Sequence, residues 1–532
     1  MYIKLYSAHV WGIEGQIVEV EADLAPGLPH FDIVGLPGAT LKESKERVRS
    51  AIRNSGFRFP TKRITVNLAP AHIRKEGALF DLAVALAILW ADQQVELSPA
   101  LQKQLDKLLF IGELALDGSL RKSEGVYPIL LSAKEHGFTH VFLPAEDEGE
   151  AELVQGITPV YIDSFRHLLE RLSSPQTWLK PPSKEDVKGA KVRIVKQLAP
   201  DKTAEENKER FEDIIGQEHV KRACEIAAAG FHHLMMVGPP GSGKTMLARR
   251  LILAMPPLSE GEWMELAKIH SVAGLWNGDR QGPTGRLFRA PHHTITTAGM
   301  MGGGNPVRPG EVTLAHLGVL FLDEFPEFRR SVIEALREPL EVRQVTIIRQ
   351  HQRYTFPANF LLVIALNPCP CGYFGYETEK HPCTCSASQI ERYRAKLSGP
   401  ILDRIDIQVE VPLLSYEEIK GKRKNYSDHY TTEKIQTRVR KALEFKAKRS
   451  PLSKPNGLLT AQEVKEVCQM TKEAEKFMEE IYEHYELSMR GYHKILKVAR
   501  TIADLNQHEL IKLEDLAEAV SFRMGKMEDF GR

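Results

Sequence analysis

The segment that most constrains the fold is a glycine-rich octet, Gly-Pro-Pro-Gly-Ser-Gly-Lys-Thr, at residues 238–245. It directly follows the apolar run Leu234–Val237, and a buried strand, a tight turn and a helix from Met246 form the context of a phosphate-binding loop. The glycines let backbone N–H groups close around phosphate oxygens, where side chains would block the approach. A glycine-rich turn without a ligand would leave the lysine unexplained. The residues expected to hold the nucleotide are Gly238, Pro239, Pro240, Gly241, Ser242, Gly243, Lys244 and Thr245.

Two residues of this loop have distinct chemical roles. We expect Lys244 to reach the β- and γ-phosphates as a mobile point charge. The hydroxyl of Thr245 is suited to ligating Mg²⁺. The sequence therefore predicts that ATP and Mg²⁺ are bound together.

Length and composition indicate a multidomain protein without a membrane segment. A chain of 532 residues exceeds one hydrophobic core, so two to four domains are expected. Its 42% hydrophobic and 27% charged residues are ordinary for a soluble protein. The longest helical candidate for a membrane span, Leu79–Ala91, is interrupted by Asp81, and residues 1–5 lack the pattern of a secretion signal. We expect a cytoplasmic protein with no membrane partner.

Charge is distributed unevenly along the chain. Residues 1–170 hold 17 lysines and arginines against 23 acids, so the remainder holds 54 against 47. An anionic partner would therefore favour the second part of the chain.

Apolar periodicity divides the chain into four regions. Residues 1–171 alternate short apolar runs with a helical stretch at Leu41–Asn54, which predicts an α/β unit. Residues 172–208 are polar and are expected to be a linker. Residues 209–412 show the βα alternation of a mostly parallel sheet, and residues 413–532 are helical. The expected strands and caps are Ile17–Val20, Ile64–Val66, Leu109–Ile111, a capping box at Thr460 and Glu463, and helices at Leu487–Leu505 and Leu513–Phe522.

Two further apolar runs end in polar residues suited to phosphoryl transfer. The run at 318–322 ends in Asp323, which is placed to hold Mg²⁺, and Glu324, which can act as general base for the attacking water. Acids often cap strands without a function, but their position 78 residues after Thr245 strengthens the assignment. The run at 360–366 ends at Asn367, which can sense the γ-phosphate or can be an ordinary turn residue.

Two arginines complete the candidate catalytic set. Arg404 lies in the segment Ser-Gly-Pro-Ile-Leu-Asp-Arg-Ile-Asp, and Arg490 lies in Ser-Met-Arg. A phosphoryl-transfer site needs mobile positive charge near the γ-phosphate, and an arginine from a neighbouring subunit can supply it. Taken alone, each arginine is more often part of a surface ion pair.

The order of these motifs resembles that of an AAA+ ATPase, more specifically its magnesium-chelatase-like branch and, within it, the bacterial YifB/ComM family. The resemblance covers nearly the whole chain. It is carried by residues 289–295 (Arg-Ala-Pro-His-His-Thr-Ile), 302–304 (Gly-Gly-Gly), 308–311 (Arg-Pro-Gly-Glu), 314–324, 367–372 (Asn-Pro-Cys-Pro-Cys-Gly) and 499–505.

The resemblance implies an AAA+ parallel-sheet core with a C-terminal helical lid and a homohexameric ring that binds ATP between subunits. Arg404 would be the finger that reaches the neighbour's site, and Arg490 the second sensor, in cis or in trans. Gly216 and Gln217 belong to a segment that resembles the adenine-side stretch of AAA+ proteins. ComM-like members are DNA motors that drive branch migration in natural transformation and recombination. The implied partners are single-stranded or branched DNA and recombination proteins.

Segments 289–310 and 341–357 correspond to the two pore insertions of this family. The second has the pattern of a β-hairpin whose tip offers Arg349 and Arg353 for phosphate contacts. A solvated basic turn is the alternative.

Four of the six cysteines lie within 17 residues, as Cys369, Cys371, Cys383 and Cys385. In a reducing compartment such a cluster indicates a metal site, and zinc suits four thiolates in a closed structural centre. The alternatives are free thiols that oxidise on isolation and an iron–sulfur cluster.

Residues 74–82 and 112–120 resemble the proteolytic domain of Lon. Aligning them with the Lon pattern places Leu79 at the position of the nucleophilic serine and Ile129 at that of the lysine base. Aliphatic side chains can neither attack a carbonyl nor accept a proton, so we expect the fold without the peptidase. Ring assembly or partner contact is then the better role.

Three functions remain open on the sequence. The leading hypothesis is an ATP-driven DNA motor. The others are a magnesium-chelatase-type ATPase that remodels a partner protein, and an adaptor that uses ATP only to form a ring. The Lon-like region and the cysteine cluster argue against the chelatase, whose rings lack them, and DNA-stimulated ATP hydrolysis would separate the first hypothesis from the others.

Overall fold

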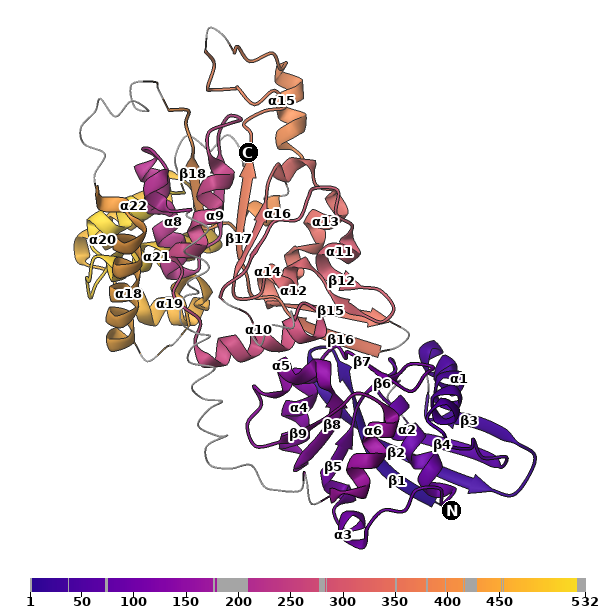
Figure 1. Ribbon diagram of the computed structural model, residues 1–532. Coiled ribbons are helices and arrows are strands. Elements are labelled where there is room, and N and C mark those ends of the chain that lie inside the picture. Colours follow the sequence, from indigo (N-terminus) through magenta and orange to yellow (C-terminus); the bar gives the residue numbers. More distant parts are fainter. Residues whose placement is uncertain are drawn as a thin grey trace.

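The computed structural model describes residues 2–36, 38–71, 75–175, 178, 209–276, 283, 285–349, 352–378, 381–397, 399–414, 416, 428–450, 452 and 454–523. They form an N-terminal domain, a central domain around a five-stranded sheet, and a C-terminal group of helices beside that sheet (Figure 1). Most of the linker expected at 172–208 lies outside the described residues. No helix of the described residues is long and apolar enough to cross a membrane.

The N-terminal domain is α/β, as expected, and contains two main sheets. Its four-stranded sheet has the order β1-β2-β4-β3, and a three-stranded parallel sheet has the order β5-β8-β9. Trp178 packs against Phe142, so this domain reaches at least to that residue. Its elements are β1 (Tyr2–Trp11), β2 (Glu14–Ala25), β3 (His30–Val34), α1 (Ala39–Asn54), β4 (Arg63–Ala69), α2 (Asp81–Ala91), α3 (Pro99–Gln102), β5 (Leu108–Phe110), β6 (Glu113–Leu114), β7 (Leu120–Arg121), α4 (Val126–Glu135), β8 (His140–Pro144), α5 (Glu148–Ala151), β9 (Thr158–Ile162) and α6 (Phe165–Ser173).

The central sheet has the order β11-β14-β17-β10-β18, and every neighbouring pair is parallel, which confirms the predicted parallel sheet. Its three inner strands, β14, β17 and β10, are short and entirely apolar, as is typical of a parallel sheet covered on both faces. The elements are α8 (Glu218–Gly230), β10 (Leu234–Val237), α9 (Lys244–Ala254), α10 (Glu260–Val272), β11 (Phe288–Arg289), α11 (Thr297–Met301), β12 (Gly302–Gly303), β13 (Arg308–Pro309), α12 (Glu311–Leu314), β14 (Val319–Leu322), α13 (Arg330–Ala335), α14 (Arg337–Val342), β15 (Gln344–Arg349), β16 (Gln352–Pro357), β17 (Leu361–Leu366), α15 (Ala387–Arg394), α16 (Gly399–Leu402) and β18 (Ile407–Glu410).

The C-terminal helices pack on α8 and continue its hydrophobic core. An ion pair with two hydrogen bonds joins Arg222 of α8 to Glu518 of the last helix, at 2.7 and 3.1 Å. The predicted capping box is present, since Thr460 and Glu463 accept each other's backbone N–H groups. The helices are α18 (Thr432–Arg449), α19 (Ala461–Val467), α20 (Lys472–His484), α21 (Met489–Leu505) and α22 (Leu513–Ser521).

Helix α10 of the central domain is packed into the N-terminal domain (Figure 1). Its Trp263 is fully buried in a hydrophobic cluster that also contains Ile129 of α4. The ring of Tyr127 lies edge-on to Trp263, with centroids 6.3 Å apart, and stacks with Trp276 at 6.0 Å. Because the two domains share one hydrophobic core at this interface, which we call the joint, we expect their relative position to be fixed.

Buried carboxyl groups accompany this apolar joint. Glu150 accepts hydrogen bonds from Ser271 of α10 and from the backbone N–H of Tyr127. Asp147 accepts from the backbone N–H of Ser123, at 3.1 Å to one carboxyl oxygen. Burial, opposed by the hydrogen bond from Ser123 and assisted by the negative charge of the neighbouring Glu150, raises the pKa of Asp147 to about 7. The folded state therefore binds a proton at Asp147 more tightly than the unfolded chain does.

This shift predicts a pH dependence of stability at the joint. The contribution of the neutral Asp147 carboxyl is fully present below about pH 4 and is lost as the pH rises through about 7. Asp147→Asn removes the titration, so at pH 8 it should raise the free energy of unfolding by about 2–4 kcal/mol and raise Tm. Thermal unfolding at pH 5 and 8 measures it, with exposed Glu146→Gln as the control. A Tm at pH 8 no higher than that of the wild type would contradict the prediction.

Candidate functional site

The phosphate-binding loop lies where the sequence predicts it, between the end of β10 and the start of α9. Gly241 and Gly243 have φ angles of +76° and +93°, which favour glycine. Gly238 is required for another reason: a Cβ there would lie 2.2 Å from the backbone oxygen of Val411. The loop is therefore shaped by conformational and by steric demands together.

Lys244 connects the loop to the neighbouring strand. Its ammonium donates to the backbone oxygens of Gly238 and Pro239, at 2.8 and 2.9 Å, and to Asn367 Oδ1 at 3.2 Å. Burial lowers the pKa of Lys244, and the charge of Asp323 opposes that shift. The lysine and the predicted γ-phosphate sensor thus lie at one site.

The residues predicted to hold Mg²⁺ also meet. Thr245 Oγ1 donates to Asp323 Oδ2 at 2.8 Å, so two hard oxygen ligands converge beside the loop, and this donor set fits Mg²⁺. The next residue, Glu324, has a φ of +50°, a left-handed conformation that is unusual for a residue other than glycine. Such strain is often found at functional sites.

The structure adds one residue that the sequence reasoning did not single out. His293 Nδ1 lies 3.5 Å from Glu324 Oε2, the carboxylate predicted to be the general base. Only its place inside the segment 289–295, which carries the family resemblance, could have drawn attention to it.

Gly216 and Gln217 lie at the start of α8, both with positive φ angles. The Gln217 side chain donates to the backbone oxygen of Pro412 at 2.7 Å, just after β18. This contact ties the predicted adenine-side segment to the strand beside β10.

Arg404 and Arg490 lie together, but away from the phosphate-binding loop. Both line a cavity of about 260 Å³ whose other lining residues include Glu341, Lys494 and Lys497. Arg404 donates to Glu341 at 2.7 Å, and Arg490 is exposed at the start of α21.

The cavity lies at the amino ends of the strands, whereas the nucleotide loop lies at their carboxyl ends. It is lined by residues that precede β10, β17 and β18, whereas the loop and Asn367 follow β10 and β17. Because the strands are parallel, one strand length, about 13 Å for the four residues of β10, separates the two edges. Neither arginine is positioned to reach the nucleotide loop of its own chain.

The second predicted insertion is a hairpin, as expected. Strand β15 pairs with β16 in antiparallel register, from Gln344 opposite Pro357 to Arg349 opposite Gln352. Arg353 is exposed, Arg349 is half-buried, and the two tip residues 350 and 351 lie outside the described residues. The Tyr354 ring stacks on Trp11 of the N-terminal domain at 4.4 Å, so this domain supports the hairpin directly.

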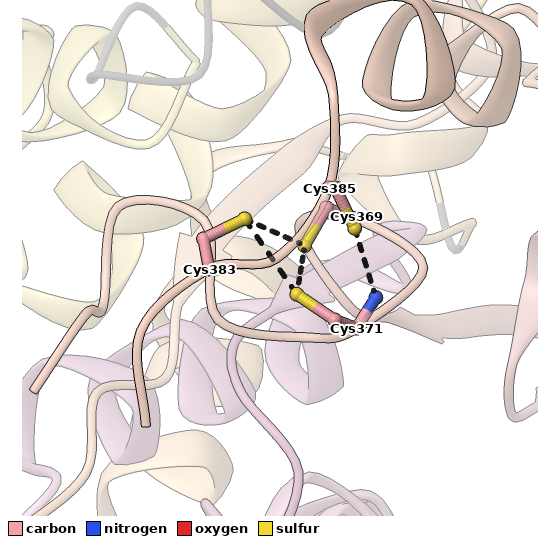
Figure 2. A group of neighbouring side chains, drawn as sticks. All are labelled: Cys369, Cys371, Cys383 and Cys385. Carbon is pink, nitrogen blue, oxygen red and sulfur yellow. Dashed lines mark hydrogen bonds between the residues drawn. The ribbon is translucent and has the colours of Figure 1, made fainter. Parts of the chain in front are cut away.

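The four clustered cysteines come together in space (Figure 2). All four Sγ atoms lie within 4.8 Å of one another, and Cys369 Sγ is 3.3 Å from Cys371 Sγ and 3.8 Å from Cys383 Sγ. A zinc ion with Zn–S bonds of about 2.3 Å requires S–S separations of about 3.8 Å, so this donor set fits zinc. Backbone N–H groups donate to two of the sulfurs, Cys369 and Cys385, which favours thiolates.

The cysteine cluster touches the nucleotide site. Cys369 follows Asn367 by two residues. Gly372 has a φ of +91°, and a Cβ there would lie 2.6 Å from Pro240 Cδ in the phosphate-binding loop. A conformational change in the cysteine cluster would therefore alter the positions of the phosphate-binding loop and of Asn367.

The two residues aligned with the catalytic pair of Lon, which are themselves apolar, also lie in apolar surroundings. Leu79 and Ile129 belong to the same hydrophobic cluster, the one shared with α10, and Ile129 is fully buried. These positions offer no nucleophile and no base.

The parallel sheet, with a phosphate loop after β10, paired acids after β14 and an asparagine after β17, defines an AAA+ ATPase core with a helical lid. Comparison with known sequences supports this class. The model described as magnesium chelatase, subunit ChlI, matches residues 210–419, and its C-terminal counterpart matches 429–523. The model described as subunit ChlI of Mg-chelatase matches residues 20–147.

Similar proteins extend over the full length. Competence protein ComM of Haemophilus influenzae is 40% identical over 98% of this chain and 97% of its own. YifB of Escherichia coli is 38% identical over 96% and 95%. Lon protease 2 of Bacillus subtilis is 29% identical over 34% of each chain. The protein therefore belongs to the YifB/ComM family of magnesium-chelatase-like AAA+ ATPases.

Proposed function

We propose that the protein is an ATP-driven DNA motor that works as a ring of identical subunits, a hexamer as in the family resemblance, and unwinds or branch-migrates DNA. The observation that carries the ring is the separation of the nucleotide loop from Arg404 and Arg490 on opposite edges of one sheet. Ring packing would bring one subunit's arginine edge against the next subunit's loop. The DNA substrate is supported by the basic hairpin and by similarity to a protein named for competence.

Within a subunit, the loop residues bind the phosphates and the strand-end residues perform hydrolysis. Lys244 would leave its backbone acceptors for the β- and γ-phosphates, and Thr245 with Asp323 would hold Mg²⁺. When bound, this ion supplies charge neutralisation at the phosphates. Glu324 would accept the proton of the attacking water, while Asn367 orients it.

Across the subunit interface, Arg404 would act as the finger. Its guanidinium neutralises the charge that develops on the neighbour's γ-phosphate, and such arginines are worth about 10³–10⁵ in turnover. Its present partner Glu341 is 59% exposed, so exchanging that carboxylate for a phosphate costs little burial. Arg490, exposed in the same cavity, would contact the same nucleotide as the second sensor.

DNA would pass the hairpin β15–β16 and the insertion at 289–310. Arg349 and Arg353 suit sequence-independent phosphate contacts, because guanidinium groups bind phosphate oxygens without reading bases. Trp11 beneath Tyr354 would keep the hairpin in place against the load of the strand.

The cysteine cluster would hold a structural zinc ion through Cys369, Cys371, Cys383 and Cys385. The sulfur separations and the N–H donors support this assignment over free thiols. Because Gly372 lies against Pro240, the four cysteines, when they hold the ion, would keep the phosphate-binding loop and Asn367 in position.

A chelatase-type remodeller is the second candidate. The match of residues 20–147 carries the name of a chelatase subunit, so the N-terminal domain does not by itself separate the two functions. The full-length similarity to ComM and the basic hairpin favour the DNA motor. An adaptor without motor activity would bind ATP and form rings but would not displace DNA strands.

The ring proposal predicts complementation between two inactive variants. Arg404→Ala should bind ATP yet lose at least about a hundredfold in turnover, because the finger acts on the neighbour. Lys244→Ala should lose nucleotide binding. Mixed rings contain interfaces with a normal loop facing a normal finger, so mixing should recover part of the activity. The readout is ATP hydrolysis against mixing ratio; no recovery in rings shown to be mixed would place Arg404 in its own subunit's site.

The DNA proposal predicts that Arg349→Ala with Arg353→Ala weakens DNA binding and strand displacement while ATP hydrolysis without DNA persists. Losing two phosphate contacts should flatten the dependence of log K on log salt by up to about 2. Binding across a salt series and displacement on a forked duplex measure it.

The matched control removes two exposed lysines of α18, Lys441 and Lys448, which are equally basic but lie on the lid. Equal loss in both double variants would indicate diffuse electrostatic attraction. A wild-type protein that neither binds nor displaces DNA would favour the chelatase-type remodeller.

The zinc proposal predicts one zinc ion per chain, lost in Cys371→Ser with Cys383→Ser. Turnover should fall at least fivefold or so, because the loop against Pro240 loses its anchor. Metal analysis and ATP hydrolysis measure it, with Cys468→Ala, a buried cysteine outside the cluster, as the control. Full activity without zinc would contradict this role.

A further inference from the structure

Lys494 of α21 lines the cavity that contains Arg404 and Arg490, but the proposed function gives it no role. Its ammonium lies 3.1 Å from Asp406 Oδ1 and donates to the backbone oxygen of Ile405, also at 3.1 Å. The Lys494 side chain is 14% exposed and the Asp406 side chain 8%. A buried lysine of the helical lid is therefore bound to the segment that directly precedes β18.

This side chain is close in sequence or in contact to both arginines of the cavity. The two residues that it binds, Ile405 and Asp406, directly follow Arg404. Arg490 lies four residues before Lys494 in α21, and residues four apart in a helix lie on one face, a turn from each other. The ion pair thus joins the helix that carries one arginine to the segment that carries the other.

The Asp406 carboxylate is held in place from the side of the sheet. Its Oδ2 accepts from the backbone N–H of His233 at 3.2 Å, and His232 Nδ1 lies 3.5 Å from the same oxygen. Both histidines directly precede β10. Burial would raise the pKa of Asp406, but Lys494 and His232 hold it well below its usual range. Asp406 is therefore ionised at neutral pH and fixed at the amino ends of β10 and β18.

The lid supplies two cations to this contact. Burial lowers the pKa of Lys494 to about 8, and the charge of Asp406 opposes that shift. The ammonium is thus charged at pH 7 and depends on its partner, because an unpaired buried charge is strongly destabilising. Arg523, which follows α22, donates to the same Ile405 oxygen at 2.9 Å. Two side chains of the lid therefore hold the carbonyl group next to Arg404.

Two arginines can act on one phosphate only if the separation of their guanidinium groups is right. Arg404 precedes β18, whereas Arg490 lies at the start of α21, so a tilt of the lid against the sheet would change that separation. Misplacing a catalytic group by about 1 Å can cost about a hundredfold in rate. A buried contact that prevents such a tilt therefore bears directly on turnover.

We propose that Lys494 is a positioning residue whose ion pair with Asp406 sets the spacing of Arg404 and Arg490, so that both reach the nucleotide bound by the neighbouring subunit. This inference rests on the proposed function. Two other roles compete with it. In one, Lys494 only stabilises the lid over the nucleotide of its own subunit; in the other, its ammonium contacts the neighbour's phosphate directly.

The test measures ATP binding and ATP hydrolysis by Lys494→Met. Kd for ATP should stay within about twofold of the wild type, because the nucleotide loop lies at the other ends of the strands, while kcat should fall at least about tenfold. Mixing with Lys244→Ala should recover activity as far as mixing Arg404→Ala with Lys244→Ala does. Combined with Arg404→Ala, the change should lower kcat by less than the product of the two single effects.

Two further variants separate the competing roles. Asp406→Asn removes the other half of the ion pair and should show the same loss and the same recovery on mixing. The matched control is Lys446→Met, because Lys446 is also a buried lysine of the lid and donates to the backbone oxygen of Lys454. Its kcat should stay near the wild type. If thermal unfolding shows that Lys494→Met is unstable, Lys494→Met with Asp406→Asn replaces it, since no unpaired buried charge remains.

Each outcome supports or overturns the inference. A rise in Kd for ATP without recovery on mixing would show that Lys494 only stabilises its own lid, and an unchanged kcat would show that the ion pair has no effect on turnover. Full activity of Asp406→Asn would show direct phosphate contact by Lys494. Recovery of Arg404→Ala but not of Lys494→Met would reject this inference alone. Failure of both in rings shown to be mixed would reject the ring proposal with it.

Discussion

The parallel pairing of β10 with β17 on one side and β18 on the other is the interaction on which the rest depends. Parallel strands bring all their carboxyl ends to one edge, and here that edge carries the phosphate loop, the acids and the asparagine. The amino ends form the other edge, with Arg404 and Arg490 beside a cavity. The nucleotide loop and the two arginines therefore lie at opposite ends of the same parallel strands.

Three other parts of the protein are connected to the carboxyl ends of these strands. The cysteine cluster packs through Gly372 onto Pro240, and His293 touches Glu324 from the first insertion. The N-terminal domain contacts the two insertions and not this end of the sheet itself. Its Glu124 accepts a hydrogen bond from Arg308, and its Trp11 stacks on Tyr354. The cysteine cluster, the first insertion and the N-terminal domain are thus all connected, directly or through one further contact, to this end of the sheet.

Short-range features of the sequence predicted much of this arrangement. The loop, the apolar strands, the capping box at Thr460 and the hairpin each depend on residues a few positions apart, so local patterns suffice. The pairing of Thr245 with Asp323 was within reach because both follow recognisable strands. The hexamer, the metal and the DNA contacts stay predictions.

The rest depends on contacts between distant segments that leave no local pattern. The packing of Trp263 of α10 against Tyr127 of α4 could not be foreseen. The sequences of both helices have the ordinary pattern of amphipathic helices, which does not say which surface each helix covers. The same holds for His293, which resembles any loop histidine until the fold places Glu324 beside it. The sequence left open whether Arg490 acts on the nucleotide of its own subunit or of a neighbour. The position of α21 beside the sheet follows from tertiary packing, which leaves no local pattern in the sequence.

The shared core at α10 also has a consequence for synthesis. Tyr127 is translated about 136 residues before Trp263, an interval of roughly 7–27 s at 5–20 residues per second. During that time the nascent N-terminal domain leaves the ribosome with one apolar side uncovered. The apolar side chains of α4 therefore lack their cover until α10 has been translated and has packed against them.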